Sequence, residues 1–147
     1  LFFIIIASIA GARIHFFDLL KSKKSIIHVP ISSVEKKNPI DLKEEIILYI
    51  GKNYCNPDIN LSVLSEEFGR SNNDISQIVK DRTTNTFPRY VNYLRLEEAK
   101  RILKEGHFAT ISEVGYAVGF NSASNFIRVF KSQIGVSPKS YVEQEKG

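Results

Sequence analysis

The sequence contains no methionine, no tryptophan and only one cysteine, Cys55. A single cysteine excludes an internal disulfide and favours a reducing compartment. The absence of methionine, even at position 1, indicates a fragment of a longer chain or a processed start. Eight glycines and five prolines are too few for a collagen-like repeat. With 43% apolar and 24% charged residues, the composition is that of a globular chain and excludes wholesale disorder.

Residues that carry catalytic or metal chemistry are also sparse. His15, His28 and His107 are far apart, and no Cys/His/Asp cluster has metal-ligand spacing. No phosphate-binding loop or nucleophile elbow occurs. Cys55 is the one candidate nucleophile, but a lone cysteine near a helix end is far more often a small, partly buried side chain. We therefore expect no metal, no cofactor and no enzymatic activity.

Charge is distributed unevenly along the chain. The net charge is +4, from 20 basic and 16 acidic residues. Residues 1–40 hold six of the basic and two of the acidic residues, so 14 of each sign remain in residues 41–147. The net positive charge of the whole chain therefore comes from its first forty residues. It is no argument for nucleic-acid binding by the remainder.

Residues 1–12 carry no charge, and Lys21, Lys23 and Lys24 follow shortly after. As a helix this run is about 18 Å long, whereas a membrane span needs about 20 residues. The run starts at the first residue, so truncation would account for the shortfall. Basic residues beside a span mark its cytoplasmic side. We expect residues 1–20 to be the end of a transmembrane helix and 21–40 a juxtamembrane linker, with the rest in the cytoplasm at the inner membrane. The alternative is a helix of a missing soluble domain, in which case the chain is cytoplasmic.

Helical patterns dominate residues 41–147, and no convincing strand appears. Capping signals, turn glycines and prolines delimit seven predicted helices. They begin near Asp41, Leu61, Ser71, Phe87, Thr110, Ser122 and Pro138. Three starts have the pattern of a capping box: Asp41/Glu44, Ser71/Asp74 and Thr110/Glu113. The fold class is therefore all-α.

A structural unit of two helices around a glycine turn occurs twice. Gly69 matches Gly119 at an offset of 50, and Tyr90 matches Tyr141 at an offset of 51. The inward apolar positions between them match as well. A short helix, a glycine turn and a second helix are the parts of a helix-turn-helix. The repeat therefore predicts two helix-turn-helix units joined by the long helix over 87–105.

The second helix of each unit has a polar outer face suited to DNA. Amide side chains can pair with adenine, and basic side chains can reach guanine or phosphate. In the first unit these candidate contacts are Asn72, Asn73, Ser76, Gln77 and Lys80. In the second unit they are Ser122, Ser124, Asn125, Arg128 and Lys131. Polar residues coat the outer faces of many helices, but their recurrence on both repeated helices favours a functional face.

The segment ISEVGYAVGFNSASNFIRVFKSQIGVSPKSY (111–141) strongly resembles the second helix-turn-helix signature of AraC/XylS-family transcription regulators. YVNYLRLEEAKRIL (90–103) resembles the linker helix of that family, with Arg95, Ala99 and Leu103 in their usual places. The first unit, 61–80, resembles the family more loosely. Family-typical residues are replaced at Ser65, Val79, Thr84, Gly115 and Val142. Alanine is usual at 115, where glycine also permits close packing, at a cost of up to ~1 kcal/mol in helix propensity.

The resemblance implies sequence-specific binding of double-stranded DNA and regulation of transcription. Two successive major-groove segments would be read, about 34 Å of DNA apart. RNA polymerase is a further candidate partner. Signal sensing and homodimerisation would belong to the missing N-terminal part, with residues 1–20 in the membrane. The alternative function is a helical protein–protein adaptor without DNA binding, which the zero net charge of residues 41–147 favours.

Overall fold

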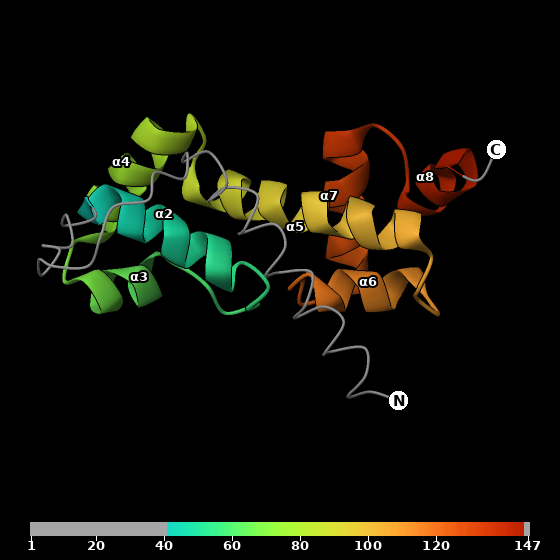
Figure 1. Ribbon diagram of the computed structural model, residues 1–147, viewed down its shortest axis with the longest axis horizontal. Helices are drawn as coiled ribbons and strands as arrows, with labels where there is room; N and C mark the ends of the chain where they lie inside the picture. Colours follow the sequence, from blue (N-terminus) through green and yellow to red (C-terminus); the bar gives the residue numbers. More distant parts are fainter. Residues whose placement is uncertain (1–40, 146–147) are drawn as a thin grey trace, which may run out of the picture. The chain divides into compact units, whose positions relative to one another are not determined.

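The computed structural model describes residues 41–145. The predicted membrane segment, residues 1–20, and the predicted linker, residues 21–40, lie outside this range. Within it, no helix is long and apolar enough to cross a membrane. The described residues form seven helices and no strand, which confirms the all-α prediction (Figure 1). These helices are α2 (Leu42–Asn53), α3 (Leu61–Phe68), α4 (Asn72–Thr83), α5 (Phe87–Glu105), α6 (Ile111–Ala117), α7 (Ala123–Ile134) and α8 (Pro138–Glu145).

The helix starts follow the predicted caps, but only one predicted capping box is reciprocal. At α6, the Thr110 hydroxyl accepts from the Glu113 amide (3.2 Å), and the Glu113 carboxylate accepts from the Thr110 amide (3.4 Å). At α4, Ser71 accepts from the Asp74 amide without a return bond in the described structure. The shorter Asp74 side chain lacks the extra methylene with which glutamate reaches back. Asp41 caps α2 through one oxygen and binds Arg82 through the other.

Two separate apolar clusters fill the interior. The first combines α2, α3, α4 and the start of α5, with Ile75 and Val79 fully buried. The second combines the end of α5 with α6 and α7, with Phe126 and Phe130 fully buried. Helix α5 contributes to both clusters and so joins the two helix-turn-helix units (Figure 1).

The predicted repeat is visible in the packing. Tyr90 packs against the first cluster and Tyr141 against the second. The Tyr141 ring lies edge-on to Phe130, with ring centroids 5.6 Å apart, and burial raises the pKa of Tyr90. The two turn glycines also share a positive φ, which is 60° at Gly69 and 98° at Gly119. Left-handed backbone of this kind is accessible to glycine at little cost.

Candidate nucleic-acid interface

Helix α4 buries one face and presents the other to solvent. Ile75 and Val79 have no exposed surface, which fixes the rotation of the helix against the first cluster. Of the five predicted contact residues on α4, four are exposed and Ser76 is half-buried. The structure thus brings together on one helix face Asn72, Asn73, Ser76, Gln77 and Lys80.

The electrostatics of α4 are mixed. The Gln77 amide donates to the Asp81 carboxylate at 2.7 Å. Arg82 forms an ion pair with Asp41 at 2.6 Å, which ties the end of α4 to the start of α2. Lys80 has no ion pair within residues 41–145. Lys80 is therefore the cation of α4 that is available to a phosphate or a base.

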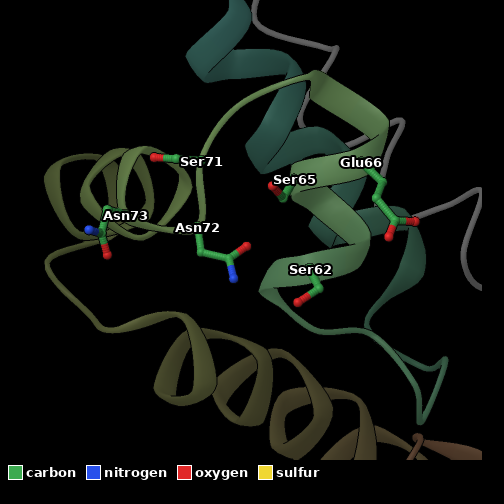
Figure 2. A pocket seen from close by; sticks show the side chains of 6 residues that line it. All are labelled: Ser62, Ser65, Glu66, Ser71, Asn72 and Asn73. Carbon is green, nitrogen blue, oxygen red and sulfur yellow. The ribbon is translucent and has the colours of Figure 1, made fainter.

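An open polar hollow of about 390 Å³ lies between α3 and the start of α4 (Figure 2). Figure 2 shows the Ser62 hydroxyl and the Asn72 amide pointing into the space between the two helices. Both groups can donate hydrogen bonds to a nucleic-acid backbone. Glu66 also lines the hollow and disfavours an anion on that side. Sequence analysis did not identify Ser62, although its place in the first turn of a helix-turn-helix was a usable signal.

Helix α7 is more strongly two-sided than α4. Phe126 and Phe130 are fully buried and Val129 is nearly so. The opposite face exposes all five residues predicted for this unit, which are Ser122, Ser124, Asn125, Arg128 and Lys131. No acidic residue occurs between Ser122 and Gln133, so the positive charge of this face is unopposed within the helix.

Two hydrogen bonds organise the exposed face of α7. The Ser122 hydroxyl caps the helix by accepting from the Asn125 amide nitrogen at 3.2 Å. The Asn125 side-chain oxygen accepts from Arg128 Nη2 at 2.8 Å. The guanidinium is therefore held over the first turn of the helix, with other N–H groups left to donate. A planar guanidinium can pair through two N–H groups with the O6 and N7 acceptors of guanine.

One exposed residue of α7 was missed by the sequence analysis. Ile127 is 40% exposed and lies between Phe126 and Arg128, off the buried stripe. An apolar side chain in a major groove can contact the thymine methyl group. The available signal was an isoleucine that breaks the inward pattern of positions 126, 129 and 130.

Comparison with known proteins decides the family. A family profile described as "Helix-turn-helix domain" matches residues 64–144, more than half of the chain. The chain belongs to the AraC/XylS family of helix-turn-helix proteins. This family consists of DNA-binding transcription regulators, and for this domain that confirms the prediction that it is not an enzyme.

Relatives and solved structures agree with this AraC/XylS assignment. The chain is 33% identical over 126 residues to the transcriptional activator RhrA of Rhizobium meliloti, covering 84% of this chain and 38% of RhrA. It is 31% identical to the C-terminal domain of the two-component response regulator yesN from Fusobacterium nucleatum, with a TM-score of 0.65, covering 70% of this chain and 99% of that structure. The DNA-binding domain of AdpA, solved with a target DNA, shares the fold at a TM-score of 0.67 and 19% identity, over 73% of this chain and 95% of that domain. The chain spans 38% to 57% of the length of the first curated relatives that it matches.

No group of three metal-ligating side chains comes together within residues 41–145. Cys55 is partly buried in the turn after α2, where its backbone carbonyl lies against Gly119. The packing therefore indicates a structural role for Cys55.

Proposed function

We propose that this chain binds specific double-stranded DNA and thereby regulates transcription. The main support for this proposal is the repeated arrangement of α4 and α7. Each is the second helix of a helix-turn-helix, each is fixed by its own apolar cluster, and each exposes a polar, cation-bearing face. The names of the relatives, which include a transcriptional activator and a DNA-bound domain, support it.

The proposed division of labour follows from the two helix faces. On α7, Arg128 and Asn125 read base edges, while Lys131 and the Ser122 and Ser124 hydroxyls bind base edges or phosphates. On α4, the polar side chains either contact base edges or bind the DNA backbone and so fix the register of the protein, and Lys80 binds phosphate. These polar residues are Asn72, Asn73, Ser76 and Gln77. The Gln77 amide bonds Asp81 through one N–H, which leaves its second N–H and its side-chain oxygen for a base. Two recognition helices on one domain read two segments of major groove, about one helical turn apart on B-DNA.

The experiment is selection of binding sites from random duplex DNA by the fragment 38–147 at several salt concentrations. The expected result is a site with two blocks about 10 base pairs apart, bound more weakly as salt rises. The double variant Arg128→Ala/Lys131→Ala is the control, and we expect it to lose the block read by α7. Failure to enrich any site at low salt, even with an artificially dimerised fragment, would contradict the proposal.

A protein–protein adaptor is the second candidate function. The equal numbers of basic and acidic residues in 41–147 favour it, because DNA-binding domains are usually basic. The same selection separates the two functions. A DNA reader loses affinity steeply with salt, whereas an adaptor shows weak nucleic-acid binding with little salt dependence.

We propose in addition that residues 1–20 anchor the protein in the inner membrane, with the DNA-binding part in the cytoplasm and a sensor in the part that precedes this chain. The uncharged run at 1–12 and the three lysines at 21, 23 and 24 support this. Homodimerisation through that preceding part and a contact with RNA polymerase belong to the same proposal. Fractionation of bacteria that express a longer chain, with the rest of the span before residue 1, tests the anchor, because the uncharged run at 1–12 is shorter than a span. Fragment 38–147 is the matched control, and recovery of the longer chain in the soluble fraction would contradict the proposal.

A further inference from the structure

Arg95 is a buried charged residue in the middle of α5. It is 9% exposed, and no other charged side chain of the described residues is as buried. Its Nε donates to the backbone carbonyl of Tyr54 at 2.7 Å, and its Nη2 donates to that of Asn56 at 2.9 Å. The guanidinium carbon lies 5.4 Å from the centre of the Phe120 ring. Arg95 therefore contacts the end of α2 and the turn of the second helix-turn-helix at once.

The partners of Arg95 suit a guanidinium at this place. The carbonyls of residues 54 and 56 follow the C-terminal end of α2, where helix carbonyls lack intrahelical partners and the dipole is negative. The Phe120 ring offers its face to the cation. Burial lowers the pKa of Arg95, so its charge is partly desolvated and the two carbonyls are the hydrogen-bond acceptors that compensate it.

A second contact between the same two parts of the chain involves Gly119 and Cys55. A Cβ built on Gly119 would lie 2.6 Å from the backbone oxygen of Cys55, so the turn between α6 and α7 touches the chain just after α2. Residues 54–56 are thus held by Arg95 and face Gly119. We refer to Arg95, residues 54–56 and Gly119-Phe120 as the junction.

The junction lies where the two apolar clusters separate. Along α5, Val91 belongs to the first cluster and Leu96 to the second, and Arg95 stands between them. The clusters share no buried residue. Besides the continuity of α5, the junction contacts therefore restrain one helix-turn-helix unit relative to the other.

We propose that Arg95 is a positioning residue that sets the orientation of α7 relative to α4, and with it the spacing between the two DNA blocks that the protein accepts. This rests on the proposed bipartite DNA binding. One added base pair moves a block by about 3.4 Å and rotates it about the DNA axis by roughly a tenth of a turn. Rigidly held helices cannot follow both changes, whereas units joined by α5 alone can.

Arg95→Lys is the sharpest variant because it keeps the charge. Lysine presents a point charge and lacks the planar fork that reaches two carbonyls and stacks on a ring. Arg89→Lys is the matched control, an exposed residue of the same helix with the same chemical change. Fragment 38–147 is suitable because it forms one compact unit that contains both clusters and the junction. The corresponding domain of yesN was also solved as a separate chain.

The measurement is affinity for a series of duplexes in which the two selected blocks are one base pair closer, optimally spaced, or one or two base pairs further apart. A duplex with a single block reports local binding. For the wild type and Arg89→Lys we expect each spacing error to weaken binding roughly tenfold, comparable to a mismatched base pair. For Arg95→Lys we expect a flatter spacing profile, with single-block affinity within about twofold of wild type.

The outcomes separate this inference from the proposed function. A wild type without bipartite binding contradicts both. A wild type with a spacing preference that Arg95→Lys retains in full contradicts the inference alone. If Arg95→Lys does not fold, Phe120→Leu decides, because it removes the ring face beside the guanidinium and keeps an apolar side chain at this buried position. An unchanged spacing profile in a folded Phe120→Leu protein would then overturn the inference.

Discussion

Thr84, which ends α4, has a φ of 59° and is the one non-glycine residue with positive φ in the described range. A β-branched side chain in this left-handed conformation costs roughly 1–2 kcal/mol, whereas glycine adopts it freely. The residue departs from the glycine that its family usually has here, and the structure shows the backbone conformation that glycine would serve. The amide of Thr84 still donates to the Lys80 carbonyl at 2.9 Å, so the helix cap itself is intact.

We therefore predict that Thr84→Gly raises the free energy of unfolding by up to about 1 kcal/mol. The relieved strain exceeds the extra entropy that glycine loses on folding, ~0.5–1 kcal/mol. Urea unfolding of fragment 38–147 measures the difference. Thr83→Gly is the control, because Thr83 is helical and donates to the Val79 carbonyl, so the same change there should destabilise. A less stable Thr84→Gly protein would contradict the assigned strain.

Gly115 brings α6 into close contact with α7. A Cβ at this position would lie 2.9 Å from Cβ, Cγ and Cδ1 of Phe126, which is fully buried and cannot move aside. The sequence alone indicated that alanine and glycine both permit close packing here, with glycine at a cost in helix propensity. The interhelical distance that decides between them is a tertiary quantity, and no local pattern in the sequence contains it.

We predict that Gly115→Ala lowers the free energy of unfolding by roughly 1–2 kcal/mol. Overpacking costs about 1–3 kcal/mol, and the gain in helix propensity of up to ~1 kcal/mol offsets part of it. Gly51→Ala in α2 is the matched control, since nothing lies within 4 Å of its added Cβ. That variant should gain stability, and thermal or urea unfolding of both proteins gives the comparison. Equal effects of the two substitutions would show that α6 can shift away from α7.

At the scale of elements, the two recognition helices differ in charge. Helix α7 carries Arg128 and Lys131 with no acidic residue on the helix. On α4, Lys80 shares the helix with Asp74 and Asp81. Neighbouring carboxylates repel DNA phosphates and so reduce the contribution of a nearby cation to the affinity for DNA. Helix α7 is therefore the stronger contributor to the proposed DNA affinity.

We predict that Arg128→Ala weakens binding to the selected site by about 1–3 kcal/mol, and that Lys131→Ala also weakens it more than Lys80→Ala does. Quantitative titration of one duplex at fixed salt provides the ranking. Lys43→Ala, at an exposed position of α2, removes the same charge outside both recognition helices and serves as the control. Equal losses for all three recognition-helix variants would contradict the difference between α4 and α7.

Elements were predictable from the sequence because their limits are locally encoded. The predicted helix over 87–105 coincides with α5, since Gly106 supplies its left-handed C-cap. Pro138 opens α8 as expected. Contacts across the chain were not predictable in the same way. Arg95 bonds to a carbonyl 41 residues earlier, and nothing in the local pattern distinguishes that arginine from an exposed one.

At the scale of the whole molecule, the excess of positive charge lies outside the part of the chain that contains the helix-turn-helix units. The proposed recognition faces lie in a part with equal numbers of basic and acidic residues, whereas residues 21–37 hold five lysines and one glutamate. Each phosphate neutralised contributes about −0.9 to the slope of log affinity against log salt, whatever the sequence. Base contacts by α4 and α7 would carry the specificity, and the lysines upstream would add only affinity.

We therefore predict that fragment 21–147 binds random duplex DNA more tightly than 38–147, with a salt slope steeper by up to about 4. The ratio of the affinities for the selected site and for random DNA should stay the same as for 38–147, because sequence-independent phosphate contacts strengthen binding to both duplexes by the same factor. A variant of 21–147 with its five lysines between 21 and 37 replaced by glutamine is the matched control, and it should behave like 38–147. If 21–147 instead bound the selected site more tightly while its affinity for random DNA stayed unchanged, these residues would contact bases, and specificity would extend beyond the two helix-turn-helix units.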